Sequence, residues 1–407
     1  MSTPGTPVVP VSTPTIASLR DVQEPSSPQE LAGALYEAAA EGRAVVPVGG
    51  GGALAVGNLT ADAALAVSTR NLSRVVEYQP TDMTLSVQSG ASLADIRSVL
   101  GEYGQMLPIE ASLPANATIG GLLATALTGP RRYGGGSLRD VIIGITVAYA
   151  DGTVGKAGGL VVKNVSGFDM MRIHHGALGT LGVITSANFK VLPIPRSEFS
   201  VLHPVQSLAD LGDVLPRLRA PSLRPVSLVV RRELDQWLLA ARFEGRPSGL
   251  DAVAASIGGF LDLSGKVDDA DSSDYWQIFM DGRAFSDNDE VRLQIRAMPT
   301  ESVNVAERAL EVADRTGANV WRIEIEPGVG LVTISWAHDE GVSALTVGAI
   351  REELPDATVM VLTAPDIVKR AIDVWGEEPE AIDLMRRLKQ EFDPNRVLNP
   401  GRFAGKI

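Results

Sequence analysis

The residues most able to do chemistry are glycines and small residues placed between apolar runs from Pro108 to Pro193. The clearest groups are Ala117-Thr-Ile-Gly-Gly121, Thr128-Gly-Pro-Arg-Arg132 and Gly176-Ala-Leu-Gly-Thr-Leu-Gly-Val-Ile184. Glycine lets a backbone come close to a flat or charged group, and clustered backbone N–H groups can bind an anion. The apolar, β-branched runs between them suit buried strands. The pattern predicts a backbone-lined slot for a phosphate-bearing cofactor.

A second glycine run lies upstream, directly after a predicted strand over 44–48. It consists of Gly49, Gly50, Gly51, Gly52 and Ala53. Backbone N–H groups that point into one space can hold a pyrophosphate without a lysine, but a flexible turn explains the run equally well. The run contains no Gly-Lys-Ser/Thr, so it is not a P-loop, and it does not have the pattern of a Rossmann fingerprint.

The group at 117–121 is predicted to begin a helix. The free N–H groups and the positive dipole end of a helix favour an anion or a polarised ring edge. Gly120 and Gly121 would let the backbone lie against an aromatic plane. The alternative is a close helix–helix contact that the two glycines permit.

Composition excludes several classes of function. The net charge of −13 over 407 residues argues against nucleic acid as a partner, because phosphate binding needs a basic face. The absence of cysteine excludes disulfides, a thiolate nucleophile, an iron–sulfur cluster and a cysteinyl-flavin link. Four histidines leave little material for a metal site, and none is predicted.

The elements that must position these residues are predicted from periodicity. Residues 1–27 are rich in Pro, Ser and Thr and are expected to form a disordered tail. Ser27 then caps a helix that starts at Pro28. Glycine-punctuated strands and helices continue to 195, and short β-type runs mixed with helices follow from 196 to 355. Residues 356–407 form a segment with a strand over 357–362 and an amphipathic helix over 381–392. No run of about 18 apolar residues occurs, so no membrane span is expected.

The order of the glycine motifs from Pro47 to Ile184 resembles the FAD-binding domain of the vanillyl-alcohol oxidase/para-cresol methylhydroxylase (PCMH) family of flavoproteins. This resemblance implies an α+β fold, with a two-subdomain PCMH-type FAD-binding domain over 28–195 and a smaller α+β cap domain over 196–355. The segment 356–407 would return to the FAD domain.

Three stretches are most similar to the glycolate oxidase FAD-binding subunits, the E subunits. They are Ala124-x-x-x-Thr-Gly-Pro-Arg-Arg132 with Arg139-Asp140, then Lys163-Asn-Val-x-Gly-x-Asp169, then Phe392-Asp-Pro-x-x-Val-Leu-Asn-Pro-Gly-Arg402. The resemblance implies that FAD is contacted at the pyrophosphate, along the ribityl chain and flavin ring, at the flavin border, at the adenine end and from the C-terminus. The pyrophosphate would be contacted by Gly49, Gly50, Gly51, Gly52 and Ala53, and the ribityl chain and flavin ring by Pro114, Ala117, Thr118, Gly120, Gly121 and Ala124. The flavin border would be formed by Thr128, Arg132, Arg139 and Asp140, and the adenine end by Gly182, Val183 and Ile184. The C-terminal contact would come from Asn399 with Pro400, Gly401 and Arg402.

Structural alternatives stand beside several of these roles. Arg132 and Arg139 could be surface residues, and Arg139 with Asp140 could form a local ion pair worth under about 1 kcal/mol. Asn399-Pro-Gly401 could be only a tight turn. Many family members attach FAD covalently through a histidine in or near the glycine loop, but this loop has no His, Cys or Tyr. FAD is therefore expected to bind non-covalently.

The catalytic residues stay unassigned. Flavin-dependent oxidation of a 2-hydroxy acid needs an arginine to hold the carboxylate and a base within about 3 Å of the hydroxyl. Arg292, Arg296 and Arg322 on predicted cap strands could hold the carboxylate, and surface salt bridges are the alternative. Alternation along a strand places Arg292 and Arg296 on one face. His338 is the single candidate base, although a lone loop histidine is usually solvated, and no His-x-His pair occurs.

The absent histidine pair fits the FAD-binding subunit of a glycolate oxidase-like complex that oxidises a small 2-hydroxy acid. The expected partners are a larger FAD-containing paralogous subunit and an iron–sulfur subunit, and the complex would be cytoplasmic or peripheral at the membrane through those partners. The alternative is a stand-alone FAD-dependent oxidoreductase for a 2-hydroxy acid or alcohol. A third hypothesis is a non-enzymatic scaffold that has lost FAD.

Overall fold

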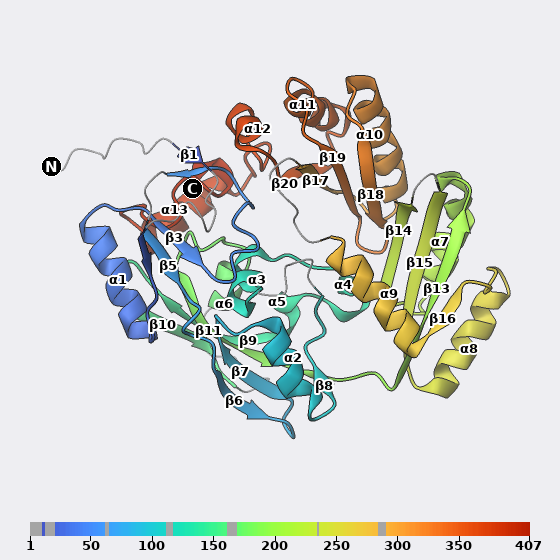
Figure 1. Ribbon diagram of the computed structural model, residues 1–407, viewed down its shortest axis with the longest axis horizontal. Coiled ribbons are helices and arrows are strands. Elements are labelled where there is room, and N and C mark those ends of the chain that lie inside the picture. Colours follow the sequence, from blue (N-terminus) through green and yellow to red (C-terminus); the bar gives the residue numbers. More distant parts are fainter. Residues whose placement is uncertain are drawn as a thin grey trace.

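The computed structural model describes residues 10–12, 21–61, 65–110, 117–160, 169–233, 236–283 and 290–407. Within these residues, sheets of three, five and eight strands form the body of the protein, with helices packed against them (Figure 1). The mixture of parallel and antiparallel sheets with intervening helices confirms the α+β class predicted from the sequence.

The smallest of these sheets is parallel and has β5 in its centre. Its strands are β2 (Asp21–Gln23), β3 (Val45–Val48) and β5 (Leu65–Ser68). Helix α1 (Pro28–Ala40) precedes β3, and the Ser27 hydroxyl accepts the Glu30 N–H, as the predicted cap requires. A separate pair joins β1 (Pro10–Ser12) to β4 (Thr60–Ala61).

The expectation of a disordered tail as far as residue 27 was wrong for its last part. Asp21–Gln23 form β2 and pair in register with Leu65–Val67 of β5. The composition of the tail predicts how little apolar surface it can bury, but a sheet edge also pairs backbone N–H and C=O groups whatever the side chains are. The part of the tail before Asp21, apart from β1, lies outside the described residues.

The five-stranded sheet is antiparallel, in the order β10-β9-β11-β7-β6. Helices α2 (Leu93–Gly101) and α3 (Ile119–Thr125) bury Ile96 and Leu123 against it, while α1 and the parallel sheet share a second core with Ala148 and Val183. The glycine slot therefore lies where two packed layers meet. The remaining elements of this half are β6 (Val75–Gln79), β7 (Thr84–Gln88), β8 (Gln105–Met106), α4 (Arg132–Gly135), α5 (Leu138–Val141), β9 (Ile142–Ala148), β10 (Val154–Gly158), α6 (Met170–His174), β11 (Val183–Lys190) and β12 (Leu192–Pro193).

The eight-stranded antiparallel sheet forms the cap, in the order β16-β13-β15-β14-β18-β19-β17-β20. Helices α7, α8, α10 and α11 share a hydrophobic core with one face of it, and α9 packs on the other face (Figure 1). The elements are β13 (Ser197–Val205), α7 (Leu211–Leu218), β14 (Ser227–Glu233), β15 (Gln236–Gly245), α8 (Pro247–Gly258), β16 (Lys266–Asp268), α9 (Asp269–Asp281), β17 (Glu290–Arg296), α10 (Ser302–Thr316), β18 (Val320–Glu326), β19 (Leu331–Ala337), α11 (Ser343–Glu353) and β20 (Thr358–Thr363).

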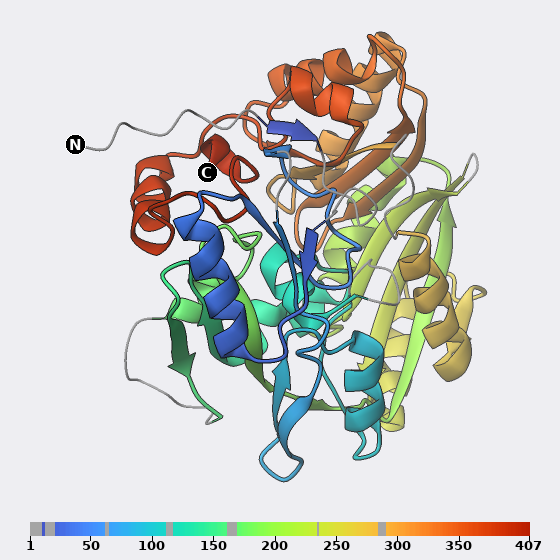
Figure 2. The same ribbon diagram turned by 60° about the vertical axis from the view of Figure 1, so that its left-hand side comes forward.

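The cap extends beyond the boundary expected at residue 355. β20 pairs with β17 from Thr358↔Arg296 to Thr363↔Arg292, so it is an edge strand of the cap sheet. The sequence showed this strand but not its partner, because strand pairing is set by tertiary contacts. After β20 come α12 (Asp366–Ala371) and α13 (Ile382–Phe392), and the chain then returns to β3, where Val45 and Leu398 form a bridge. Figure 2 shows this C-terminal segment, in red, beside α1.

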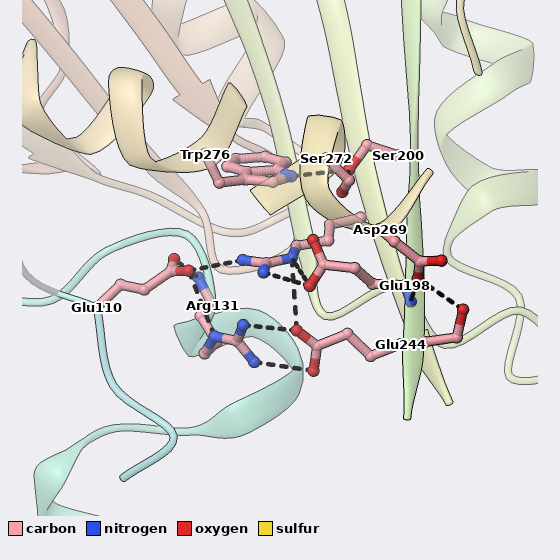
Figure 3. Close-up of polar contacts among 10 residues, drawn as sticks. Glu110, Arg131, Glu198, Ser200, Glu244, Asp269, Ser272 and Trp276 are labelled. Atoms are coloured by element: carbon pink, nitrogen blue, oxygen red, sulfur yellow. Dashed lines mark hydrogen bonds and ion pairs between the residues drawn. The ribbon is translucent and has the colours of Figure 1, made fainter. Parts of the chain in front are cut away.

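Five charged side chains, none more than 15% exposed, join the FAD-binding half to the cap (Figure 3). Arg131 pairs with Glu110 at 3.3 Å and with Glu244 at 2.5 Å. Arg242 pairs with Glu110 at 2.8 Å, with Glu198 at 2.5 Å and with Glu244 at 3.4 Å. We call these five residues the interdomain ion cluster; it lines a cavity of about 540 Å³ beside α2 and α9.

None of the described helices is both long and apolar enough to cross a membrane. The described residues also contain no group of three or more His, Cys, Asp or Glu side chains placed to hold a metal ion.

Candidate cofactor and active site

The glycine loop after β3 forms one wall of a cavity at the meeting point of the two layers. Within the described residues, the backbone amides of Gly51, Gly52 and Ala53 donate to no acceptor, and all three residues line the cavity. Free amides in a row are suited to an anion such as a pyrophosphate. The cavity is lined by Pro47, Gly49, Gly50, Gly51, Gly52, Ala53, Leu54, Ala117, Thr118, Gly121, Ala124, Thr125, Leu178, Gly179 and Arg402.

The opposite wall is the start of α3. The Thr118 hydroxyl caps this helix by accepting the Gly121 N–H at 3.3 Å, and Gly121 and Ala124 face the cavity. Gly49 lies so close to Thr118 that a side chain at Gly49 would overlap the Thr118 hydroxyl. Gly120 does not line this cavity, because a side chain there would meet Ser89 at 2.6 Å. Gly120 therefore packs closely against the turn after β7, and not against another helix as the alternative interpretation of the sequence had it.

The C-terminal turn supports the loop from behind. Asn399 is buried and donates through Nδ2 to the carbonyl of Leu178 at 2.5 Å, while its own N–H donates to the carbonyl of Val45. Asn399 thus supports the cavity wall at Leu178 and Gly179 rather than lining it. Arg402 does line the cavity, and its guanidinium donates to the Leu54 and Val56 carbonyls at 2.7 and 2.9 Å. Burial lowers the pKa of Arg402 to about 10.

The residues expected at the adenine end lie in packed cores. Val183 belongs to the core beneath α1, and Ile184 faces the core beneath α2 and α3. A side chain at Gly182 would meet Val147 at 2.6 Å. None of the three lines the glycine-loop cavity, whose wall is formed instead by Leu178 and Gly179 a few residues upstream. Pro114 and residues 163–168 of the Lys163–Asp169 motif lie outside the described residues.

The residues expected at the flavin border spread along the surface beside α3. Thr128 and Arg132 line a small cavity with Leu122 and Leu127. Arg139 and Asp140 are exposed on α5 and no ion pair joins these two described side chains. Hydrogen bonds from the Ser137 backbone and hydroxyl instead lower the pKa of Asp140.

His175 lies close to this group, although the sequence gave it no role. Burial lowers its pKa, Arg139 and Arg132 add to this effect, and Asp140 opposes it. Its Nε2 is buried with no hydrogen-bond partner among the described residues. The neighbouring His174 is held by the Tyr149 hydroxyl at 3.1 Å, and burial lowers its pKa to about 4.

The cap sheet presents charged side chains towards the FAD-binding half. On β17 the residues Val291, Leu293 and Ile295 enter the core under α10 and α11, so Arg292 and Arg296 share the other face, as alternation predicted. The same alternation on β18 and β19 gives that face Arg322, Glu324 and Thr333. Side chains of this face line a third cavity, together with residues that follow α9 and α3 and one residue of β20. The lining residues are Leu127, Thr128, Arg283, Arg292, Gln294, Arg322, Glu324, Thr333 and Leu362.

Two of the three arginines in this third cavity, Arg283 and Arg322, have hydrogen-bonding capacity left for a further anionic partner. Arg292 is bidentate to Glu290, with N···O distances of 3.1 and 3.0 Å. Arg283 pairs with Glu324 at 2.9 Å and with Glu326 at 3.0 Å, but its buried Nη1 has no described hydrogen-bond partner. Arg322 donates to the Gly282 carbonyl and forms no ion pair with any described carboxylate. Burial lowers the pKa of Arg322, with Glu324 opposing and Arg292 adding, yet the group stays cationic at neutral pH because its ordinary pKa is so high.

His338, the candidate base, follows β19 and lies elsewhere. Its Nδ1 is 3.1 Å from the Ser343 hydroxyl, which also accepts the Asp339 N–H at the start of α11. His338 lines neither the glycine-loop cavity, nor the small cavity at Thr128 and Arg132, nor the third cavity, nor the cavity beside the interdomain ion cluster. In the cap, Trp276 and Trp336 are buried and Trp321 is 49% exposed.

Comparison with known proteins agrees with this geometry. Residues 21–167 match the family described as FAD binding domain, and residues 374–403 match the C-terminal domain of FAD linked oxidases. The free amides of the glycine loop and the guanidinium behind them fit the pyrophosphate of that cofactor. The chain is therefore an FAD-dependent oxidoreductase. Its matched segments are the FAD binding domain and part of the C-terminal domain of FAD linked oxidases, which confirms the resemblance to FAD-binding flavoproteins seen in the sequence.

Among its relatives is the glycolate oxidase subunit GlcE of Escherichia coli, 26% identical over 339 residues that cover 82% of this chain and 85% of the relative. The glycolate oxidase subunit GlcD of Bacillus subtilis is 24% identical over 433 residues, covering 97% and 91%. A D-2-hydroxyglutarate dehydrogenase of Xanthomonas citri is 25% identical over 419 residues, covering 93% and 88%. The solved structure of an alkyldihydroxyacetonephosphate synthase has the same fold, with a TM-score of 0.70 at 17% identity over 93% of this chain and 75% of that one.

Proposed function

We propose that this chain is the FAD-binding subunit of a glycolate oxidase-like complex that oxidises a small 2-hydroxy acid to a 2-oxo acid. The observation that carries the proposal is the third cavity, where Arg322 forms no ion pair with a described carboxylate and the Nη1 of Arg283 has no described hydrogen-bond acceptor. A guanidinium with free donors binds a carboxylate strongly and with fixed geometry. The names of the relatives, two glycolate oxidase subunits and a 2-hydroxy acid dehydrogenase, support the same substrate class.

The loop after α3 connects the two parts of the reaction. Leu127 and Thr128 line the third cavity, and Ala124 and Thr125 line the glycine-loop cavity, so only a few residues separate substrate from cofactor. Bound FAD would accept the two electrons and the α-hydrogen as a hydride equivalent. Arg322 would hold the carboxylate and Thr128 would border the reacting carbon. The hydroxyl proton must then pass to a base.

The titratable side chains lining the third cavity do not offer an obvious base. Glu324 is the single carboxylate there, and Arg283 already pairs with it. This arrangement favours a chain that works with the larger FAD-containing paralogous subunit and with an iron–sulfur subunit that takes the electrons. Such a complex would lie in the cytoplasm, held at the membrane only through its partners. The stand-alone oxidoreductase stays the second candidate because the same arginines would serve it.

The chain should first be purified alone and its visible spectrum recorded. Acid precipitation is expected to release all the yellow colour, since the loop offers no residue for a covalent link. Glycolate or D-lactate added without oxygen is expected to shift the flavin bands but not to bleach them. Bleaching by the isolated chain would replace the subunit proposal with the stand-alone enzyme.

Arg322→Met tests the carboxylate site separately. Loss of a charge-assisted, bidentate contact worth about 1.5–3 kcal/mol should weaken glycolate binding roughly tenfold to a hundredfold. The exposed Arg315→Met on α10 is the matched control and should bind as the unaltered chain does. Equal binding by both variants would exclude Arg322 from the substrate site.

A further inference from the structure

The glycine loop is held from behind by a second cation, which comes from the far end of the chain. Lys369 lies on α12, shortly after the cap strand β20, and is 4% exposed. Its ammonium donates to the carbonyls of Ala55 at 2.5 Å and Gly57 at 3.2 Å. A residue that follows the cap sheet therefore contacts the cofactor loop of the other half directly.

Arg402 contacts the same stretch of backbone. Its guanidinium donates to the carbonyls of Ala53 at 3.1 Å, Leu54 at 2.7 Å and Val56 at 2.9 Å. Between them, Lys369 and Arg402 thus bind the five consecutive carbonyls from residue 53 to residue 57. Each trans peptide unit is planar with its N–H opposite its C=O, so fixing five carbonyls fixes this part of the loop. The free amides of Gly51, Gly52 and Ala53 sit directly upstream of it.

Arg402 also places positive charge next to the cavity. Arg402 is buried, lines the cavity and forms no ion pair with a described carboxylate. A buried charge without a counter-ion is costly, and an anion in the cavity would offset that cost. Burial, followed by repulsion from Arg402, lowers the pKa of Lys369 to about 7, with Asp366 opposing. This agrees with two cations held closer together than water would favour.

We propose that Lys369 and Arg402 are positioning residues for the FAD pyrophosphate: they fix the loop from its carbonyl side and supply the positive charge behind its amides. The proposal rests on FAD binding and not on the identity of the hydroxy acid. It predicts that Lys369 governs affinity for the diphosphate part of FAD through the Ala55 and Gly57 carbonyls that it binds.

The test uses the full-length apo-protein and Lys369→Met, which keeps the length of the side chain and removes the charge. Quenching of flavin fluorescence gives the dissociation constant for FAD, which we expect to rise at least tenfold. The dissociation constant should also respond less steeply to NaCl, because one cation is gone. The control is Arg308→Met: Arg308 donates to the Glu353 carbonyl inside the cap, far along the chain from the loop. That variant should bind FAD as the unaltered protein does.

Inorganic pyrophosphate separates positioning of the phosphates from general support of the fold. It should raise the melting temperature of the unaltered apo-protein and of Arg308→Met, but not that of Lys369→Met. If Lys369→Met does not fold, Arg402→Lys keeps the charge but loses the fork, and it should show a smaller loss of FAD affinity with the same salt response as the unaltered protein. FAD affinity, salt response and pyrophosphate stabilisation that are all unchanged in Lys369→Met would overturn the proposal. Where only Arg402→Lys folds, unchanged FAD affinity in that variant would overturn it.

Discussion

Replacement of Arg242 by Met should destabilise the protein more than replacement of any comparable surface arginine. In the interdomain ion cluster the Arg242 side chain is 6% exposed, and its partners Glu110, Glu198 and Glu244 are 12%, 15% and 7% exposed. The variant would leave three carboxylates around the single cation Arg131. Removal of one partner from a buried ion pair costs about 3–5 kcal/mol, because the remaining charge is uncompensated.

The assay is urea unfolding followed by tryptophan fluorescence, since urea, unlike guanidinium, does not screen charges. Arg386→Met is the matched control: Arg386 pairs with Glu378 at 2.5 Å, but its side chain is 41% exposed, so the loss should stay below about 1 kcal/mol. Adding Glu198→Gln to Arg242→Met should recover at least about 1 kcal/mol by removing one of the excess charges. Equal losses for the two arginine variants, with no recovery in the double variant, would refute the view that the charges of this cluster depend on Arg242 for compensation.

Two further predictions concern the FAD-binding half. The buried His174 has a pKa of about 4 instead of 6.5, so its contribution to stability is complete above pH 6.5 and is lost as the pH falls towards 4. This shift corresponds to about 3 kcal/mol, and His174→Phe should flatten that part of the stability–pH curve; an unchanged curve would exclude His174 as its source. Gly49→Ala should weaken FAD binding at least tenfold, measured by flavin fluorescence, because the new methyl group overlaps the Thr118 hydroxyl. Gly33→Ala in α1, where a methyl group meets nothing within 4 Å, should leave FAD binding unchanged, and equal affinities in the two variants would contradict this account of Gly49.

The sequence predicted local structure well where side chains alternate or repeat. Arg292 and Arg296 share one face of β17 because Val291, Leu293 and Ile295 fill the core on the other. The same logic placed a strand at 357–362 and a helix at 381–392, close to the observed β20 and α13. In these places a repeat of two or of 3.6 residues predicts the element, because the spacing of the apolar side chains shows which face is buried.

Contacts between distant segments could not be predicted in this way. Nothing near Lys369 in the sequence indicates that its ammonium binds a carbonyl more than 300 residues upstream. The pairing of Glu110 with Arg131 and Arg242 likewise depends on how the two halves pack. In the predicted amphipathic helix α13 the Leu384 side chain is 51% exposed, whereas Lys389 on the same helix is fully buried and donates to the Thr180 carbonyl and to Asp393. A hydrophobicity pattern cannot predict a buried cation, because the oxygen atoms that make its burial possible can come from other segments of the chain.

The segment from Ala117 to Thr128 connects the glycine motifs with the cap arginines. Its first residues line the glycine-loop cavity, and its last residues line the third cavity, which contains the arginines of the cap. Because the segment is seven residues of helix followed by a short loop, a shift of the cap relative to α3 would change the distance between the two cavities directly. The interdomain ion cluster resists such a shift from one side, since Arg131 follows this segment by only a few residues. Lys369 resists it from the other side, where it ties the end of the cap sheet to the glycine loop. Loss of either connection should therefore affect the alignment of substrate with cofactor, even though neither group lies in the third cavity.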